Sequence, residues 1–325
     1  MKLPRREFLH LAAAAVALPA AAPSARAQNY PTRPVRIVVG YPPGGVTDII
    51  ARLIAPWLSQ RLGQQFVVEN RPGASSNIAV EMVLRAAPDG AMLFLVSATN
   101  AYNATLYEHL NFNLNRDMAP VASIGRDAFV MVVNPSLPAK TIPEFIAHAK
   151  ANPGKLNMAT SGAGSASDLY GALFKAKTGV DLLAVHYRGV GPALPDLMSG
   201  RVDVMFDPLV SAIGAIKAGK LRALGVTTRT RREVLPDVPP IGDFVPGYEA
   251  TDWTGLGAAA NTPPQIIAIL NKEVNAALAD ATFKARLAEL GVEPFPSTPA
   301  AFGRYIADYT EDWAKVIRAA GIKAE

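Results

Sequence analysis

From Arg36 onward, short β-branched runs alternate with segments of helical periodicity, and this alternation constrains the fold more than any other feature. The run RIVVGY at 36–41 is bounded by a Pro-Gly cluster, as expected for a buried strand. Apolar residues then recur on one face of a predicted helix: Val46, Ile49, Ile50, Leu53, Ile54, Trp57 and Leu58. Further strands are predicted at 65–70 and 91–99, with a helix at 77–87. Strands alternating with helices favour parallel pairing through right-handed crossovers, so we predict an α/β fold.

A second unit of the same kind begins near Phe129. Strands and helices alternate from there to Thr228, and a proline-rich, charged connection follows at 229–253. Beyond it, the segment 255–291 reads as a strand-like piece and two helices, and 299–321 reads as a final helix. The pattern thus predicts two α/β units of ordinary domain size.

The order of these units predicts that the chain crosses between two domains twice, near 127–130 and near 247–255. The first domain would then be discontinuous, built from residues 28–128 plus 250–325, and the second would comprise residues 129–249. We expect a mainly parallel sheet in each. Because aromatic residues are only 7% of the chain, we also expect mostly aliphatic cores.

Residues 1–27 have the three parts of a cleavable export signal. Basic residues come first, an apolar stretch from Leu9 to Leu18 follows, and Ala25-Arg26-Ala27 ends the segment. The apolar stretch is far shorter than the roughly 20 residues that span a bilayer, which argues against a permanent anchor. Arg5-Arg6 fits a twin-arginine signal as well as an ordinary secretory signal. Either route predicts a periplasmic protein.

Charge and cysteine content exclude several classes of function. Loss of the signal removes four basic residues and one acidic residue, so the formal charge falls from +5 to +2. So weak a positive charge gives nucleic-acid binding little support, and we expect no such partner. The chain has no cysteine, which excludes thiol catalysis and thiolate metal sites.

The stretch GYPPGGVTDII at 40–50 combines a strand end, two prolines, two glycines and a helix start. Helix N-termini carry unpaired N–H groups and about half a positive charge, so they attract anions. Gly44 and Gly45 allow close approach of a ligand, the prolines stiffen the loop, and Asp48 can cap the first turn. We predict ligand contacts from Tyr41, Pro43, Gly44, Gly45 and Asp48. A strand-to-helix turn without a ligand explains the same residues.

A second strand, Gly/Ser loop and helix occur at 157–174. Ser161, Gly162, Gly164 and Ser165 offer backbone donors and hydroxyls with little bulk. If the two domains face each other, both helix ends can point at one anion from opposite sides. A few hydrogen bonds to a charged group, worth roughly 1.5–3 kcal/mol each, could then give micromolar binding.

Other loops at the carboxyl ends of strands would complete the pocket, where ligands of open α/β sheets usually lie. The residues concerned are Ser97, Thr99, Asn100, Tyr187 and Asp207. Taken singly, each one is better explained as a turn residue, a cap or a half-buried ring than as a ligand contact.

Signatures of enzymes are missing from the mature sequence. It contains no HExxH, no GxSxG and no GxxxxGK[ST] motif, and GAGSAS departs from GxGxxG in its last residue. Asp203 and Asp207 could pair as acid and base on one strand, although caps or ion pairs explain them too. We therefore expect a binding protein with no catalytic residue, no metal and no cofactor. A nucleotide- or phosphate-using enzyme and a purely structural exported protein remain the alternatives.

Several motifs, in order, resemble one known family. They are YPPGGVTD, ENRPGASSNIA, SGAGS, YRGVGPALPDLMSGRVDVMF, LPDVPPIGDFVPGYEATDWTGL and TPPQIIAILNKEVNAAL. Together they are similar to the periplasmic receptors of tripartite tricarboxylate transporters, also called Bug-type solute receptors, over about residues 30 to 325. The resemblance implies a two-domain Venus-flytrap fold that closes on a small carboxylate in the interdomain cleft. The family's two carboxylate-binding motifs match 41–48 and 161–168 here.

The resemblance also implies that the protein delivers a small organic acid to the membrane subunits of a tripartite transporter, although sensing without transport stays open. We expect a monomer. The sequence departs from the family pattern at Ser75 and Ser76, where glycines are frequent, and at Asp168 and His186, where histidine and proline are common. Asp168 either points away as a cap or contacts a hydrogen-bond donor on the ligand. The identity of the acid is not predicted.

Overall fold

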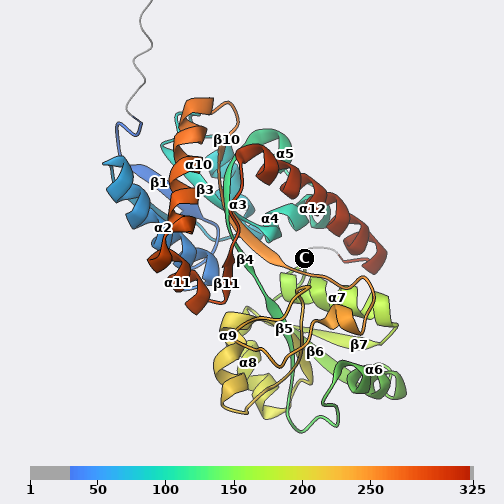
Figure 1. Cartoon of the computed structure of the whole chain (residues 1–325). Helices are drawn as coiled ribbons and strands as arrows, with labels where there is room; N and C mark the ends of the chain where they lie inside the picture. Colours follow the sequence, from blue (N-terminus) through green and yellow to red (C-terminus); the bar gives the residue numbers. More distant parts are fainter. Residues whose placement is uncertain (1–29, 323–325) are drawn as a thin grey trace, which may run out of the picture.

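The computed structural model describes residues 30–322, which form two α/β lobes joined by two adjacent strands (Figure 1). The predicted export signal at 1–27 lies outside the described residues. Among residues 30–322, no helix combines the length and apolar character that crossing a bilayer requires.

The first lobe contains a six-stranded sheet in the order β11-β4-β10-β3-β1-β2. Its strands are β1 (Val35–Val39), β2 (Phe66–Asn70), β3 (Met92–Ser97), β4 (Met118–Asp127), β10 (Asp252–Ala259) and β11 (Val292–Pro294). Its helices are α2 (Val46–Leu62), α3 (Asn77–Leu84), α4 (Ala98–Leu106), α5 (Leu114–Asp117), α10 (Pro264–Ala279), α11 (Ala281–Glu289) and α12 (Pro299–Ala320). A short 3-10 turn, η1 (Ala74–Ser76), precedes α3.

The second lobe contains a five-stranded sheet in the order β7-β6-β8-β5-β9. Its strands are β5 (Phe129–Val133), β6 (Leu156–Thr160), β7 (Leu182–His186), β8 (Val204–Pro208) and β9 (Arg222–Val226). Its helices are α6 (Ile142–Ala151), α7 (Ala166–Thr178), α8 (Val190–Ser199), α9 (Leu209–Lys217) and the 3-10 turn η2 (Ile241–Asp243).

The sheets are more mixed than the sequence predicts. Parallel pairs join β1 to β2 and β3, and β6 to β7 and β8. The strands β4, β10, β5 and β9 pair with their neighbours in antiparallel fashion. The expectation of a mainly parallel sheet in each domain is therefore wrong, because the chain leaves and re-enters the first lobe along β4 and β10, which run side by side in opposite directions.

The crossing strands also show what the sequence pattern misses. β4 is not predicted, because Pro120, Ser123 and Gly125 interrupt any β-branched run within it. Pro120 is tolerated inside the sheet because the register between β4 and β10 shifts beside it, which marks a bulge. Only Ala128 separates β4 from β5, so a single continuous path links the two sheets. The exact domain boundaries at 128/129 and 249/250 stay a prediction.

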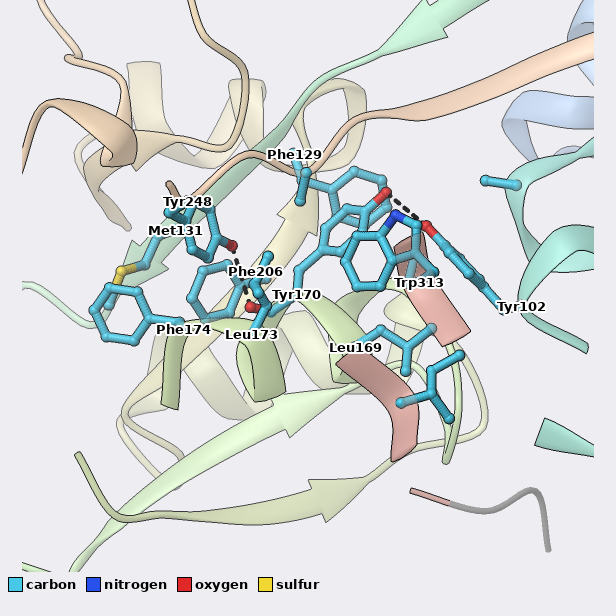
Figure 2. Packing of buried hydrophobic residues seen from close by; sticks show 14 of the residues in the cluster. Tyr102, Phe129, Met131, Leu169, Tyr170, Leu173, Phe174, Phe206, Tyr248 and Trp313 are labelled. Carbon is cyan, nitrogen blue, oxygen red and sulfur yellow. Dashed lines mark hydrogen bonds between the residues drawn. The ribbon is translucent and has the colours of Figure 1, made fainter. Parts of the chain in front are cut away.

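The cores consist mostly of aliphatic side chains, with a cluster of aromatic rings between the lobes. Valine, isoleucine, leucine and alanine fill most of the cores beside α2 and α10 and beside α8 and α9. The expectation of mostly aliphatic cores is confirmed, and the rings that are present gather mainly where α4, α7 and α12 meet (Figure 2). Trp313 of α12 contacts Tyr102 of α4 and Tyr170 of α7, with ring centroids 5.1 and 5.3 Å apart. The C-terminal helix therefore packs on both lobes.

Candidate functional site

A cavity of about 640 Å³ lies between the two lobes and is formed mainly by loops at the carboxyl ends of their strands, together with the first residues of β5 and β10. Lining residues from the first lobe are Tyr41, Pro42, Pro43, Gly45, Val46, Thr47, Ser75, Ser97, Thr99, Asp127, Asp252 and Thr254. Lining residues from the second lobe are Phe129, Ser161, Gly162, Ala163, Gly164, Ser165, Ala166, Gly189, Val190, Gly191 and Pro208. The lining contains no lysine, arginine or histidine, so the positive ends of helix dipoles are the positive groups that it presents directly.

The first loop, residues 41–48, presents the N-terminus of α2 to the cavity. Gly45 is the N-cap in extended conformation and its side of the loop is open, since an added Cβ would meet nothing within 4 Å. The first-turn amides of Val46 and Thr47 donate to no acceptor among the described residues. These free donors, together with the helix dipole, make an anion-accepting surface.

Asp48 holds this loop rather than facing the cavity. Its carboxylate accepts the Gly44 N–H at 2.9 Å and further hydrogen bonds from Arg52 and Asn70, both at 2.9 Å. Burial opposes ionisation, but the bonds from Arg52, Gly44 and Asn70 outweigh it and hold the pKa of Asp48 below its ordinary value. Asp48 is therefore an ionised clamp, and the Gly44 amide is already occupied.

The second loop, residues 161–168, is built in the same way at the N-terminus of α7. Ser165 is the N-cap, and the Asp168 carboxylate accepts the Gly164 N–H at 3.0 Å. Asp168 is buried and borders a different cavity, on the side of α7 that faces the end of α12. Burial raises its pKa, against the effects of the Gly164 N–H, His186 and Lys175. This geometry supports the capping role for Asp168.

A third helix N-terminus enters the same cavity, and none of its residues was among the predicted ligand contacts. Gly189, Val190 and Gly191 begin α8 and line the wall beside the second loop. Gly189 has φ +107°, a backbone conformation that favours glycine. The strand-glycine-helix pattern of YRGVG, which repeats that of the first two loops, was the available signal.

The structure brings together most of the predicted site residues. Those that line the cavity are Tyr41, Pro43, Gly45, Ser97, Thr99, Ser161, Gly162, Gly164 and Ser165. Those outside its lining are Gly44, Asp48, Asn100, Asp168, Tyr187 and Asp207. Asn100 accepts the Ser97 N–H at 2.9 Å, and the Tyr187 hydroxyl donates to Asp196 at 2.8 Å, so both have structural roles. Contact of any of these residues with a ligand stays a prediction.

Asp207 of β8 is fully buried, and neither of its carboxyl oxygens has a hydrogen-bond partner among the described residues. Burial raises its pKa to about 8, from 3.8. The raised pKa favours the protonated form of Asp207 at neutral pH, and Asp207 does not line the cavity, so the structure gives no support to a charged ligand contact or to a base paired with Asp203. The Asp203 carboxylate instead accepts the Asn157 N–H at 2.7 Å.

We expect Asp207→Asn to reduce the pH dependence of stability. Because the folded protein holds the Asp207 proton more tightly than the unfolded chain does, stability should fall as pH rises from about 4 to about 8. A pKa difference of one corresponds to about 1.4 kcal/mol, so the effect amounts to several kcal/mol. Urea unfolding at pH 5 and pH 9 should show that the free energy of unfolding of Asp207→Asn, relative to that of the wild type, is higher at pH 9 than at pH 5. The exposed Asp243→Asn should show no such change. If Asp207→Asn and the wild type differed in free energy of unfolding by the same amount at both pH values, Asp207 would not be a buried neutral group.

Sequence reasoning missed the wall of the cavity formed by Asp127, Asp252 and Thr254. The two acids lie at the predicted crossings between the domains, and this position was the available signal that could have placed them near the cleft. Residues 30–322 contain no group of three or more histidine, aspartate or glutamate side chains placed to hold a metal ion.

Comparisons with a family model, with related sequences and with solved structures each match most of the chain and indicate the same family. Residues 50–322 match the model of the tripartite tricarboxylate transporter family receptor. Protein BugT of Bordetella pertussis is 34% identical, over 97% of this chain and 96% of that protein. The solved structure of R. palustris Rpa4515 with adipate has a TM-score of 0.83 and 36% identity, and covers 91% of this chain and 100% of that one. MatC (Rpa3494) from Rhodopseudomonas palustris with bound malate has a TM-score of 0.78 and 33% identity, covering 89% and 100%.

Proposed function

This chain belongs to the tripartite tricarboxylate transporter receptor family, whose members are periplasmic solute receptors and not enzymes, and we propose that it captures a small organic carboxylate between its lobes. The two-domain binding-protein fold of that family is present here. In this proposal the acid is handed to the membrane subunits of a tripartite transporter. Residues 1–27 would direct the chain to the periplasm and be removed there.

The convergence of three helix N-termini from both lobes on one cavity carries the proposal. Free first-turn amides and helix dipoles stabilise an anion without a cationic side chain. Adipate and malate, bound in two related structures, are both small carboxylates. A carboxylate that contacts α2 on one lobe and α7 or α8 on the other would also favour the closed arrangement of the lobes.

The proposal is tested with purified residues 28–325 and a panel of mono-, di- and tricarboxylates and aromatic acids. We expect at least one acid to raise the melting temperature and to bind with one-to-one stoichiometry in calorimetry. A ligand at about 100 times its Kd should add about 2.7 kcal/mol of stability. Failure of every carboxylate would overturn the proposal, and so would conversion of a bound acid into a product. Growth on the identified acid after deletion of the receptor distinguishes transport from sensing.

A further inference from the structure

Two carboxyl groups face each other on the wall of the cavity nearest the crossing strands. Asp127 ends β4, Asp252 begins β10, and the two are directly opposite each other in the antiparallel pair. Side chains opposite each other in such a pair lie on the same face, with Cβ atoms about 4.5–5.5 Å apart. Both residues line the cavity, so the two acids form one acidic surface within it.

Nearby cations point elsewhere. Arg126 precedes Asp127 on the strand and therefore points to the opposite face, where its guanidinium stacks on the Phe295 ring at 3.7 Å. Arg232 donates to Glu293 at 2.7 Å. Among residues 30–322, neither Asp127 nor Asp252 forms an ion pair within 4.0 Å.

The charge on this pair is consequently poorly compensated. Burial raises the pKa of both groups, and the charge of Asp252 raises that of Asp127 further, against a weaker effect of Arg232. Asp252 accepts the Trp253 N–H at 2.9 Å, whereas the buried Oδ1 of Asp127 has no partner in the described chain. A cation in the cavity would lower both pKa values and hold the pair ionised, and it would supply the missing partner of Asp127 Oδ1.

An independent observation on the same wall points to a ligand. Thr254 lies two residues after Asp252 and therefore on the same face of β10. Its side chain is only 2% exposed, it lines the cavity, and its Oγ1 has no partner among the described residues. A buried hydroxyl without a partner is costly, so a group that binds it is expected in the occupied protein.

We propose that the ligand is a carboxylate that also carries a protonated nitrogen, held by Asp127, Asp252 and Thr254. This inference rests on the proposed function, in which the helix N-termini bind the carboxylate. The nitrogen, an ammonium or a protonated ring nitrogen, donates to the acidic pair and to Oγ1 of Thr254. A second carboxylate at this end would meet two acids and no cation, so the pair selects against dicarboxylates.

Calorimetry with three six-carbon acids tests the inference, because they differ only at the distal end. The acids are 6-aminohexanoate, adipate and hexanoate, and the five-carbon set of 5-aminopentanoate, glutarate and pentanoate repeats the comparison at a shorter length. We expect the amino acid to bind the wild type at least 10-fold more tightly than either partner in one of the two sets. In Asp127→Asn/Asp252→Asn that preference should fall at least 10-fold, while the exposed Asp243→Asn should keep it.

The outcomes distinguish failure of the acidic pair as the selective element from failure of carboxylate binding itself. If dicarboxylates or simple monocarboxylates bind as tightly as the amino acids, the inference fails and the proposed function stands. If the paired substitution leaves the preference unchanged in a protein with a cooperative melting transition, the acidic pair is not the selective element and the inference also fails. If no carboxylate in these sets or in the wider panel binds, the proposed function fails as well.

Discussion

Gly45→Asp is expected to abolish carboxylate binding without lowering the stability of the protein. Gly45 has φ −78° and ψ 165°, values that any residue adopts, and an added Cβ would meet nothing within 4 Å. Asp is a favoured N-cap residue, and replacing Gly by Asp at that position should change the free energy of unfolding by only a few tenths of a kcal/mol. The new carboxylate would accept the first-turn amides of α2 that, in our proposal, bind the ligand.

The loss of affinity in Gly45→Asp has two sources that add. The ligand loses one or two charge-assisted hydrogen bonds, worth roughly 1.5–3 kcal/mol each, and it meets a like charge in the same place. We therefore expect at least a 100-fold rise in Kd by calorimetry, with a melting temperature close to that of the wild type.

Two matched variants separate charge from shape in this experiment. Gly45→Asn has nearly the same shape without the charge and should lose less affinity than Gly45→Asp. Gly63→Asn lies at the other end of α2, at φ +73°, where Asn is tolerated, and should bind normally. Wild-type affinity in Gly45→Asp would show that the ligand does not contact the N-terminus of α2.

The loops at 41–48 and 161–168 could be predicted from sequence because their chemistry is local. A strand end, glycines and a capping residue follow one another within eight positions, and the structure places both loops on one cavity. The same reasoning predicted a ligand contact for Asp48 and left Asp168 as either a cap or a ligand contact, whereas each carboxylate accepts the N–H of a glycine four residues earlier. A cap and a ligand contact use the same residue type, so the pattern alone does not separate them.

What the sequence did not predict depends on pairing between distant segments. Asp127 and Asp252 become neighbours only through the register of β4 and β10, and β4 itself has no clear strand pattern. The burial of Asp207 likewise follows from the packing of the second sheet and not from its neighbours in sequence. The aromatic cluster could be predicted only in part. Four rings recur on one face of α12, namely Phe302, Tyr305, Tyr309 and Trp313, but their partners on α4 and α7 are distant in sequence.

This cluster makes Trp313 a side chain whose loss should strongly destabilise the protein. Trp313 is 6% exposed and packs against Tyr102 of the first lobe and Tyr170 of the second, whose hydroxyls lie 3.2 Å apart (Figure 2). Because the surrounding side chains relax only in part after a large-to-small substitution, Trp313→Ala should leave a cavity between α4, α7 and α12.

The expected cost of Trp313→Ala is about 3–5 kcal/mol of the free energy of unfolding, as for other buried aromatic side chains. Urea unfolding followed by circular dichroism measures it. Trp57 is the comparison, since its ring is half-buried on α2 and lies edge-on to Phe283 with the ring centroids 6.3 Å apart, so Trp57→Ala should cost less. Trp313→Phe should recover part of the loss by keeping a ring between Tyr102 and Tyr170. A loss below about 1 kcal/mol in Trp313→Ala would mean that the lobes are held together mainly by β4 and β10 and not by the helix that spans them.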